Sequence, residues 1–161
     1  MSTTPNVKPD IRALVKALES DPRELTLSQA LSGPQWEVLG QYMQQVTILA
    51  GRILIAQGAE DRTLYFVESG MLTVHFEDAT GKIRLAAVGG GSVVGEGAFF
   101  SRLARSATVQ AAVECRLWSL SPMRFSELSN RQPNVALALA MALGATMAKR
   151  LVSNRRRISV T

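Results

Sequence analysis

Residues 95–109, GEGAFFSRLARSATV, place Glu96 nine positions before Arg105 among mostly small side chains. Glycines flank the acid, and a serine and an alanine follow the arginine. Side chains meet along a helix at a spacing of three or four residues, so this spacing excludes a helical ion pair. Either the two charges never meet, or a loop brings both of them to a common ligand. A buried Glu–Arg pair that needs no ligand is the structural alternative.

A ligand with a ribose and a phosphate would suit both charges. Phosphate is bound well by a guanidinium and by free backbone N–H groups at the start of a helix. Arg105 supplies the guanidinium, Ser106 adds a hydroxyl, and residues 95–98 can begin such a helix. A carboxylate does not favour a phosphate, but Glu96 can accept hydrogen bonds from a sugar hydroxyl.

The chain around this stretch has the pattern of an antiparallel β-protein. From residue 45 to 120, short runs of aliphatic, aromatic and threonine residues alternate with glycine-containing turns. Such spacing favours a sandwich or roll over a parallel sheet. The predicted strands are VTIL (46–49), RILIA (52–56), TLYFVES (63–69), MLTVHFE (71–77), IRLAAV (83–88), ATVQAAV (107–113) and CRLWSL (115–120).

Helices are predicted before and after the strands. Apolar residues at 11, 14, 15 and 18 share one helical face, and Ser32 can cap a second helix. A short helix follows Pro122, and a long one runs from Pro133 to about residue 157. The fold class is therefore mainly β with flanking helices and a long C-terminal helix. Its predicted parts are an N-terminal extension (1–25), one domain (26–157) and a tail (158–161).

The amino-acid composition argues against several classes of enzyme and metal site. The 161 residues include one histidine, His75, and one cysteine, Cys115, which cannot build the usual zinc or iron–sulfur sites. Neither a catalytic triad nor a nucleotide-binding glycine motif is present. We therefore expect no catalytic residue, no metal and no internal disulfide, and an enzyme is the last of the functional hypotheses.

Targeting signals are not apparent. The N-terminus lacks a secretory pattern, and the longest apolar run, residues 135–148, has 14 residues against the roughly 20 that span a membrane. We expect a cytoplasmic protein without a membrane segment.

The net charge of +5 comes entirely from the last 13 residues, because residues 1–148 hold equal numbers of acids and bases. These five charges either stabilise the C-terminal end of a helix and aid solubility, or form a tail that binds nucleic acid or an anionic membrane.

The 95–109 stretch resembles the phosphate-binding cassette of the cyclic nucleotide-binding domain, which occurs in Crp/Fnr regulators, protein kinase regulatory subunits and cyclic-nucleotide-gated channels. The matching residues are Gly95, Glu96, Ala98, Arg105, Ser106, Ala107 and Thr108. Residues 64–74, LYFVESGMLTV, are similar to a strand pair of the family. The resemblance covers about residues 26–155 and implies a double-stranded β-helix, or jelly roll.

The resemblance also implies roles for individual residues. Glu96 would bind the ribose 2′-hydroxyl of cAMP or cGMP, and Arg105 would bind the cyclic phosphate. Ser106 would contact the phosphate or the base. The remaining implied ligand-binding positions are the backbone N–H groups of Gly97 and Ala98, the neighbouring Gly95 and Ala107, and the apolar Val74, Leu85 and Val88, which are otherwise ordinary core.

Two substitutions in the cassette motivate a different hypothesis. Gly97 stands where the family usually has leucine, and Ala104 stands where it has proline before the arginine. The alternative is a protein-interaction module that keeps the fold and has a degenerate nucleotide pocket.

The C-terminal helix resembles the dimer helix of Crp-type regulators, through residues 147–151, MAKRL. That implies a homodimer and places Arg150 and Asn154 near the ligand; a helix simply packed on the roll is the other interpretation. Only four residues follow the arginine cluster, too few for a helix-turn-helix. We therefore expect a sensor that acts on an unknown partner protein, without DNA binding by this chain alone, or a sensor fragment of a longer transcription regulator.

Overall fold

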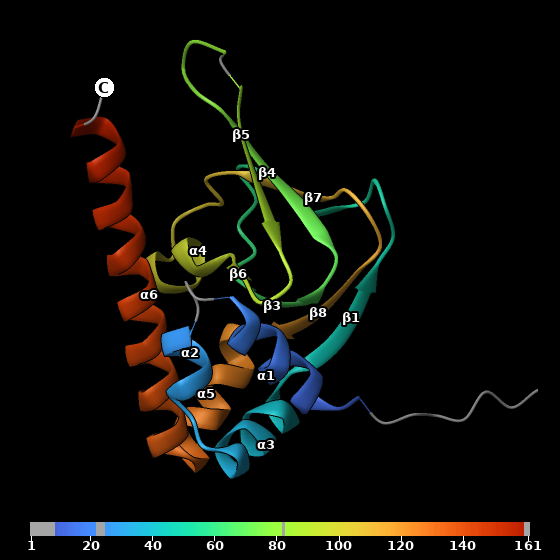
Figure 1. Cartoon of the computed structure of the whole chain (residues 1–161), viewed down its shortest axis with the longest axis vertical. Coiled ribbons are helices and arrows are strands. Elements are labelled where there is room, and N and C mark those ends of the chain that lie inside the picture. The colour runs from blue at the N-terminus through green and yellow to red at the C-terminus, as the bar shows by residue number, and fades with distance from the viewer. Residues whose placement is uncertain (1–8, 22–24, 82, 160–161) are drawn as a thin grey trace, which may run out of the picture.

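The structure is a computed structural model that describes residues 9–21, 25–81 and 83–159, without the side chains of residues 25, 26, 84 and 154–159. Two four-stranded sheets form the body, most helices gather at one end of them, and the last helix runs along one side (Figure 1).

Each sheet is antiparallel throughout. One has the order β1-β8-β3-β6 and the other the order β2-β7-β4-β5. This architecture confirms the predicted jelly roll. The strands are β1 (Gln44–Ile48), β2 (Ile53–Ile55), β3 (Leu64–Ser69), β4 (Met71–Glu77), β5 (Ile83–Gly89), β6 (Val93–Val94), β7 (Thr108–Ala111) and β8 (Cys115–Leu120).

The short strand β6 lies inside the glycine-rich stretch and was not predicted. Its two residues pair with Tyr65 and Phe66 of β3. Two apolar residues between glycines carry no strand periodicity, so only the tertiary pairing reveals them. This pairing places the start of the 95–109 stretch beside the first sheet.

The helices include the one that Ser32 was predicted to cap. They are α1 (Ile11–Ser20), α2 (Leu25–Gln29), α3 (Gly33–Tyr42), α4 (Glu96–Ser101), α5 (Pro122–Arg131) and α6 (Pro133–Ser159). Ser32 and Gln35 form a capping box at α3, and Asp10 caps α1. The five-residue α2 was not predicted, because one turn and a half gives too little periodicity to read.

The core has two parts. One lies between the helices and the first sheet, where Leu14, Trp36 and Leu39 are buried with Phe66 and Leu139. The other lies between the sheets and contains Cys115, which is fully buried. Burial raises the pKa of the Cys115 thiol, which disfavours the reactive thiolate.

Helix α6 is long and apolar. Its segment Pro133–Ser153 has a mean hydropathy of 1.6 and is long enough to cross a membrane. The longest uninterrupted apolar run in the sequence is shorter than this segment, so the sequence alone did not indicate a membrane span. One third of the segment is buried inside the protein, and the helix packs against α5, α2 and α3. The buried core helix of a soluble protein passes the same test of length and composition.

Candidate ligand-binding site

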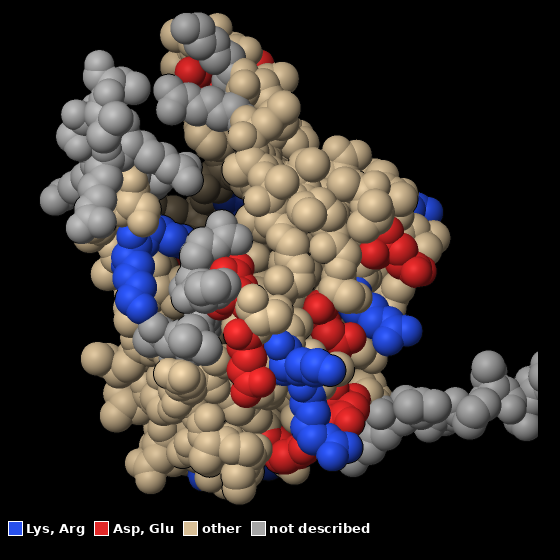
Figure 2. Space-filling view, in the orientation of Figure 1, with Lys and Arg blue, Asp and Glu red and all other residues tan. Residues whose placement is uncertain are grey.

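A cavity of about 530 Å³ opens between the second sheet, the 93–98 and 105–107 segments and α6. In Figure 2 the surface is hollowed between α6 and the β4–β5 hairpin. The cavity brings together most of the predicted ligand-binding residues, namely Val74, Val88, Gly95, Glu96, Gly97, Ala98, Arg105, Ser106, Ala107 and Arg150. It is also lined by residues that were not predicted, namely Ile55, Phe76, Ala86, Val93, Val94 and Val109.

Leu85 was wrongly predicted to line this cavity. Its side chain is 75% exposed, and the neighbouring Ala86 lines the cavity instead. Val74 pairs directly with Ala86, so these two share a face and Leu85 points to the other side of β5. The side chain of Asn154, the other residue expected near the ligand from the C-terminal helix, lies outside the described residues.

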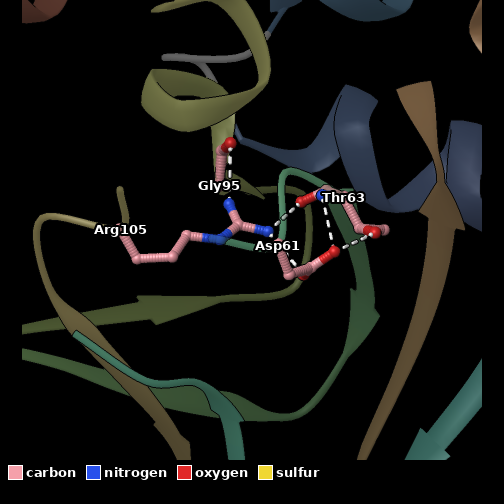
Figure 3. Close-up of polar contacts among 4 residues, drawn as sticks. All are labelled: Asp61, Thr63, Gly95 and Arg105. Atoms are coloured by element: carbon pink, nitrogen blue, oxygen red, sulfur yellow. Dashed lines mark hydrogen bonds and ion pairs between the residues drawn. The ribbon is translucent and has the colours of Figure 1, made fainter. Parts of the chain in front are cut away.

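The Arg105 side chain is almost completely buried at 3% exposure, and the protein holds it by three hydrogen bonds. Nη1 donates to the Gly95 carbonyl at 3.0 Å (Figure 3). Nη2 donates to the Thr63 carbonyl at 2.6 Å and to Asp61 Oδ2 at 3.0 Å. The Nε atom is also buried, and the described part of the chain offers it no hydrogen-bond partner.

The backbone of Arg105 is fixed as well. Its N–H donates to the Ala59 carbonyl at 2.8 Å, and its carbonyl accepts from the Gly58 N–H at 2.8 Å. The loop before β3 therefore clamps both sides of the residue. The clamp holds Arg105 even though Ala104 replaces the proline that the family resemblance would place before it.

Asp61 is a residue of the site that sequence reasoning missed, because an acid in a turn resembles ordinary solvated charge. Its Oδ1 accepts from the N–H and the hydroxyl of Thr63, at 3.3 and 2.9 Å, while Oδ2 accepts from Arg105. The Asp-x-Thr spacing is no specific signal, since Asp78 and Thr80 make the same local motif. Burial alone would raise the pKa of the Asp61 carboxyl, but the hydrogen bonds from Arg105 and Thr63 outweigh it and lower the pKa.

Replacing Asp61 with asparagine should lower the free energy of unfolding by less than about 1 kcal/mol at neutral pH, because the carboxylate is 55% exposed. The folded-state pKa lies below the ordinary value of 3.8, so the ionised form stabilises the fold above that pH. This contribution is lost as the pH falls through the lowered pKa. Urea unfolding of both proteins at neutral pH and at about pH 3 measures it; a difference that does not shrink in acid would contradict the assignment.

Glu96 meets a different arginine from the one its sequence position suggests. Its Oε1 accepts from Arg150 Nη1 of α6 at 2.5 Å, and Arg150 Nη2 donates to the Val93 carbonyl at 3.3 Å. Glu96 and Arg105 form no ion pair with each other. The interpretation of 95–109 as a buried pair of these two charges is therefore wrong, and both side chains lie at one cavity with separate partners.

The six-residue α4 carries Glu96 as its first residue. It begins after Gly95, whose φ of 85° is left-handed, and no side chain caps it. The N–H groups in the first turn of a helix have no partner within the helix. Gly97 and Ala98 therefore present such groups beside the cavity. No group of three or more histidine, cysteine or acidic side chains in the described ranges is arranged to hold a metal ion.

Comparison with known proteins agrees with this geometry. A family model described as the cyclic nucleotide-binding domain matches residues 45–132. The cAMP-activated global transcriptional regulator CRP of Escherichia coli O6:H1 is 35% identical over 100 residues, which are 61% of this chain and 46% of that protein. Glutaminase 2 of Bradyrhizobium diazoefficiens is 33% identical over 111 residues, which are 69% of this chain and 17% of that protein. The chain thus spans less than half the length of either relative.

The fold has a solved counterpart. The crystal structure of a cyclic nucleotide-binding domain from Methylobacillus flagellatus superposes with a TM-score of 0.80 at 19% identity, over 92% of this chain and 82% of that one. The family model covers more than half of the chain, and the cassette lies at the cavity between the sheet and the long helix. This chain belongs to the cyclic nucleotide-binding domain family.

Proposed function

We propose that this domain is a non-catalytic sensor that binds cAMP or cGMP and transmits binding through α6. The observation that carries the proposal is the buried Arg105 at the cavity. Its Nε is a buried donor for which the described residues provide no acceptor, and such a donor is costly to leave unpaired. A phosphate that reaches Arg105 would supply both the missing acceptor and an opposite charge.

The other roles follow from the position of each group around the cavity. Glu96 would accept from the ribose 2′-hydroxyl, and Ser106 would contact the phosphate or the base. The first-turn N–H groups of Gly97 and Ala98 would hold ligand oxygens. The apolar part of the lining, including Val74 and Val88, would cover the sugar and the base. The relative CRP of Escherichia coli is a cAMP-activated transcriptional regulator, which supports the choice of ligand class.

We also propose that the domain forms a homodimer through α6 and works in the cytoplasm. The dimer would act on an unknown partner protein rather than on DNA. Five exposed residues of α6 repeat at spacings of four and three, which is the period of a helix–helix seam. They are Leu137, Met141, Gly144, Ala148 and Leu151. The large side chains among them are 64–68% exposed, so a second copy could bury them.

A second candidate function is a protein-interaction module without a ligand. It is favoured by the fact that Glu96 and Arg105 already have protein partners, Arg150 and Asp61. A pocket whose charged groups are satisfied by the protein's own side chains needs no nucleotide to fold. This candidate shares the proposed α6 seam and differs only in what fills the cavity.

Thermal unfolding in the presence of cAMP, cGMP, cyclic di-GMP and 2′-deoxy-cAMP tests the proposal. A ligand at 100 times its dissociation constant stabilises the folded state by about 2.7 kcal/mol. We expect this for cAMP or cGMP, and weaker binding of 2′-deoxy-cAMP than of cAMP, because it offers Glu96 no 2′-hydroxyl. No stabilisation by any of the four at millimolar concentration would favour the interaction module. Analytical ultracentrifugation of the same samples measures whether the protein is a dimer.

A further inference from the structure

The side chain of Gln57 takes the place of a strand residue at the end of β4. Its Nε2 donates to the Glu77 carbonyl at 3.1 Å, and its Oε1 accepts from the Glu77 N–H at 3.0 Å. A residue of a neighbouring antiparallel strand would exchange the same two bonds. β7 pairs with β4 as far as Thr108, which faces His75. In this register Glu77 would face Ser106, which lies outside β7, so the Gln57 amide completes the sheet there.

The gap in the sheet lies where the chain before Thr108 turns aside and places Arg105 at the cavity. The Arg105 backbone bonds to residues 58–59 instead of to β4, through two hydrogen bonds of 2.8 Å. The N–H of Gln57 donates to Thr108 Oγ1 at 3.0 Å. Residues 57–59 therefore hold both the segment that carries Arg105 and the end of β4, and they set the position of one relative to the other.

Phe76, the residue before Glu77, forms part of the cavity wall. It shares a face of β4 with Val74, and both line the cavity. Among the described residues that line the cavity, Phe76 alone is aromatic. Its side chain is 37% exposed, so the ring has apolar surface that a ligand can bury. A nucleotide base is a flat π-system, and such bases stack on aromatic side chains.

We propose that the ring of Phe76 stacks on the base of the bound nucleotide and that Gln57 is the positioning residue that holds the ring in place. The inference rests on the proposed function for the identity of the ligand. Glu77 is the last residue of β4, and the β4–β5 hairpin projects beyond the other strands (Figure 1). Ile83 pairs with Glu77 on one side, and Gln57 bonds to it on the other. Without the amide, the end of β4 is held on one side alone, and the ring loses its fixed distance from Arg105.

Calorimetric titration with cAMP and cGMP tests the base contact. Phe76→Leu keeps an apolar side chain and loses the ring, so it should bind the nucleotide that the wild type binds about two- to tenfold more weakly. Phe100→Leu makes the same change at a phenylalanine that is 41% exposed and outside the cavity lining, and it should match the wild type. Wild-type affinity in a folded Phe76→Leu protein would overturn the inference and leave the proposed function standing. Binding of neither nucleotide by the wild type would overturn both.

A double-variant cycle tests the positioning role of Gln57. Gln57→Ala should weaken binding by about two- to fivefold in the wild-type background and by much less in Phe76→Leu, because the ring through which it acts is then absent. Gln110→Ala is the control, since it removes a side-chain amide that donates to the Gly51 carbonyl at 2.9 Å in the same sheet. Unchanged binding by Gln57→Ala, or a loss of equal size in both backgrounds, would overturn the role of Gln57.

Proton magnetic resonance of the bound nucleotide gives a signature that a purely structural residue would not change. The base protons should move upfield in the wild-type complex, because the ring current of Phe76 acts on a stacked base. This shift should shrink in Gln57→Ala and disappear in Phe76→Leu, whereas Gln110→Ala should keep it. A wild-type complex without the upfield shift would overturn the stacking.

Discussion

Replacing Arg105 with alanine is expected to weaken cyclic-nucleotide binding by about 1.5–3 kcal/mol, or roughly ten- to 150-fold in the dissociation constant. The Arg105 side chain is 3% exposed, and the carbonyls of Gly95 and Thr63 accept hydrogen bonds from its guanidinium. A phosphate bound in so little water gains more from this charge than it would at the surface. Calorimetric titration of the wild type and the variant with cAMP and cGMP measures the loss.

The variant also leaves those two carbonyls without their donor, so its folding must be separated from its binding. Circular dichroism and thermal unfolding establish the folded fraction before the titration. Arg105→Lys keeps the charge but presents a point charge instead of the planar fork, and should recover only part of the affinity. Arg116→Ala removes an exposed arginine on β8 and is the matched control. A folded Arg105→Ala protein with wild-type affinity would refute the proposed phosphate contact.

The strands were predictable where glycine turns separate apolar runs. Each of the seven predicted runs overlaps a strand, because the jelly roll buries one side of each and the turns need glycine or polar residues. What the pattern could not reveal was which side faces the cavity in β5. Residues 85–88, LAAV, are all apolar, so alternation gave no signal there. Predicting Leu85 rather than Ala86 as a lining residue was an error of one position, which exchanges the two faces of a strand.

Which residues lie at the cavity was easier to predict than which side chains they pair with. The resemblance of the cassette placed Glu96 and Arg105 at one cavity, because both lie in a single stretch of 15 residues. Their partners lie 54 and 44 positions away, at Arg150 and Asp61. A charge at such a distance has no periodic relation to its partner, and only the closure of the roll and the packing of α6 bring the atoms together.

Gly95→Ala is expected to lower the free energy of unfolding by about 1–3 kcal/mol, the cost of a side chain in a left-handed backbone conformation that its surroundings enforce. Gly95 has a φ of 85°, and an added Cβ would lie 2.7 Å from Arg105 Nη1 and 2.8 Å from the Thr63 carbonyl oxygen. Both atoms belong to the hydrogen bonds that hold the guanidinium. The methyl group would therefore displace the guanidinium from these bonds, and nucleotide affinity should fall together with stability.

Gly97→Ala, two positions later, is a control with the opposite expectation. An added Cβ there meets nothing within 4 Å, and the residue lies inside α4. Alanine at a helical position should stabilise the fold by up to about 1 kcal/mol. Urea unfolding of the two variants therefore compares the same chemical change in a crowded left-handed site and in an open helical one. Equal stabilities for the two would contradict the view that the positive φ of Gly95 and its contact with Arg105 hold the site in place.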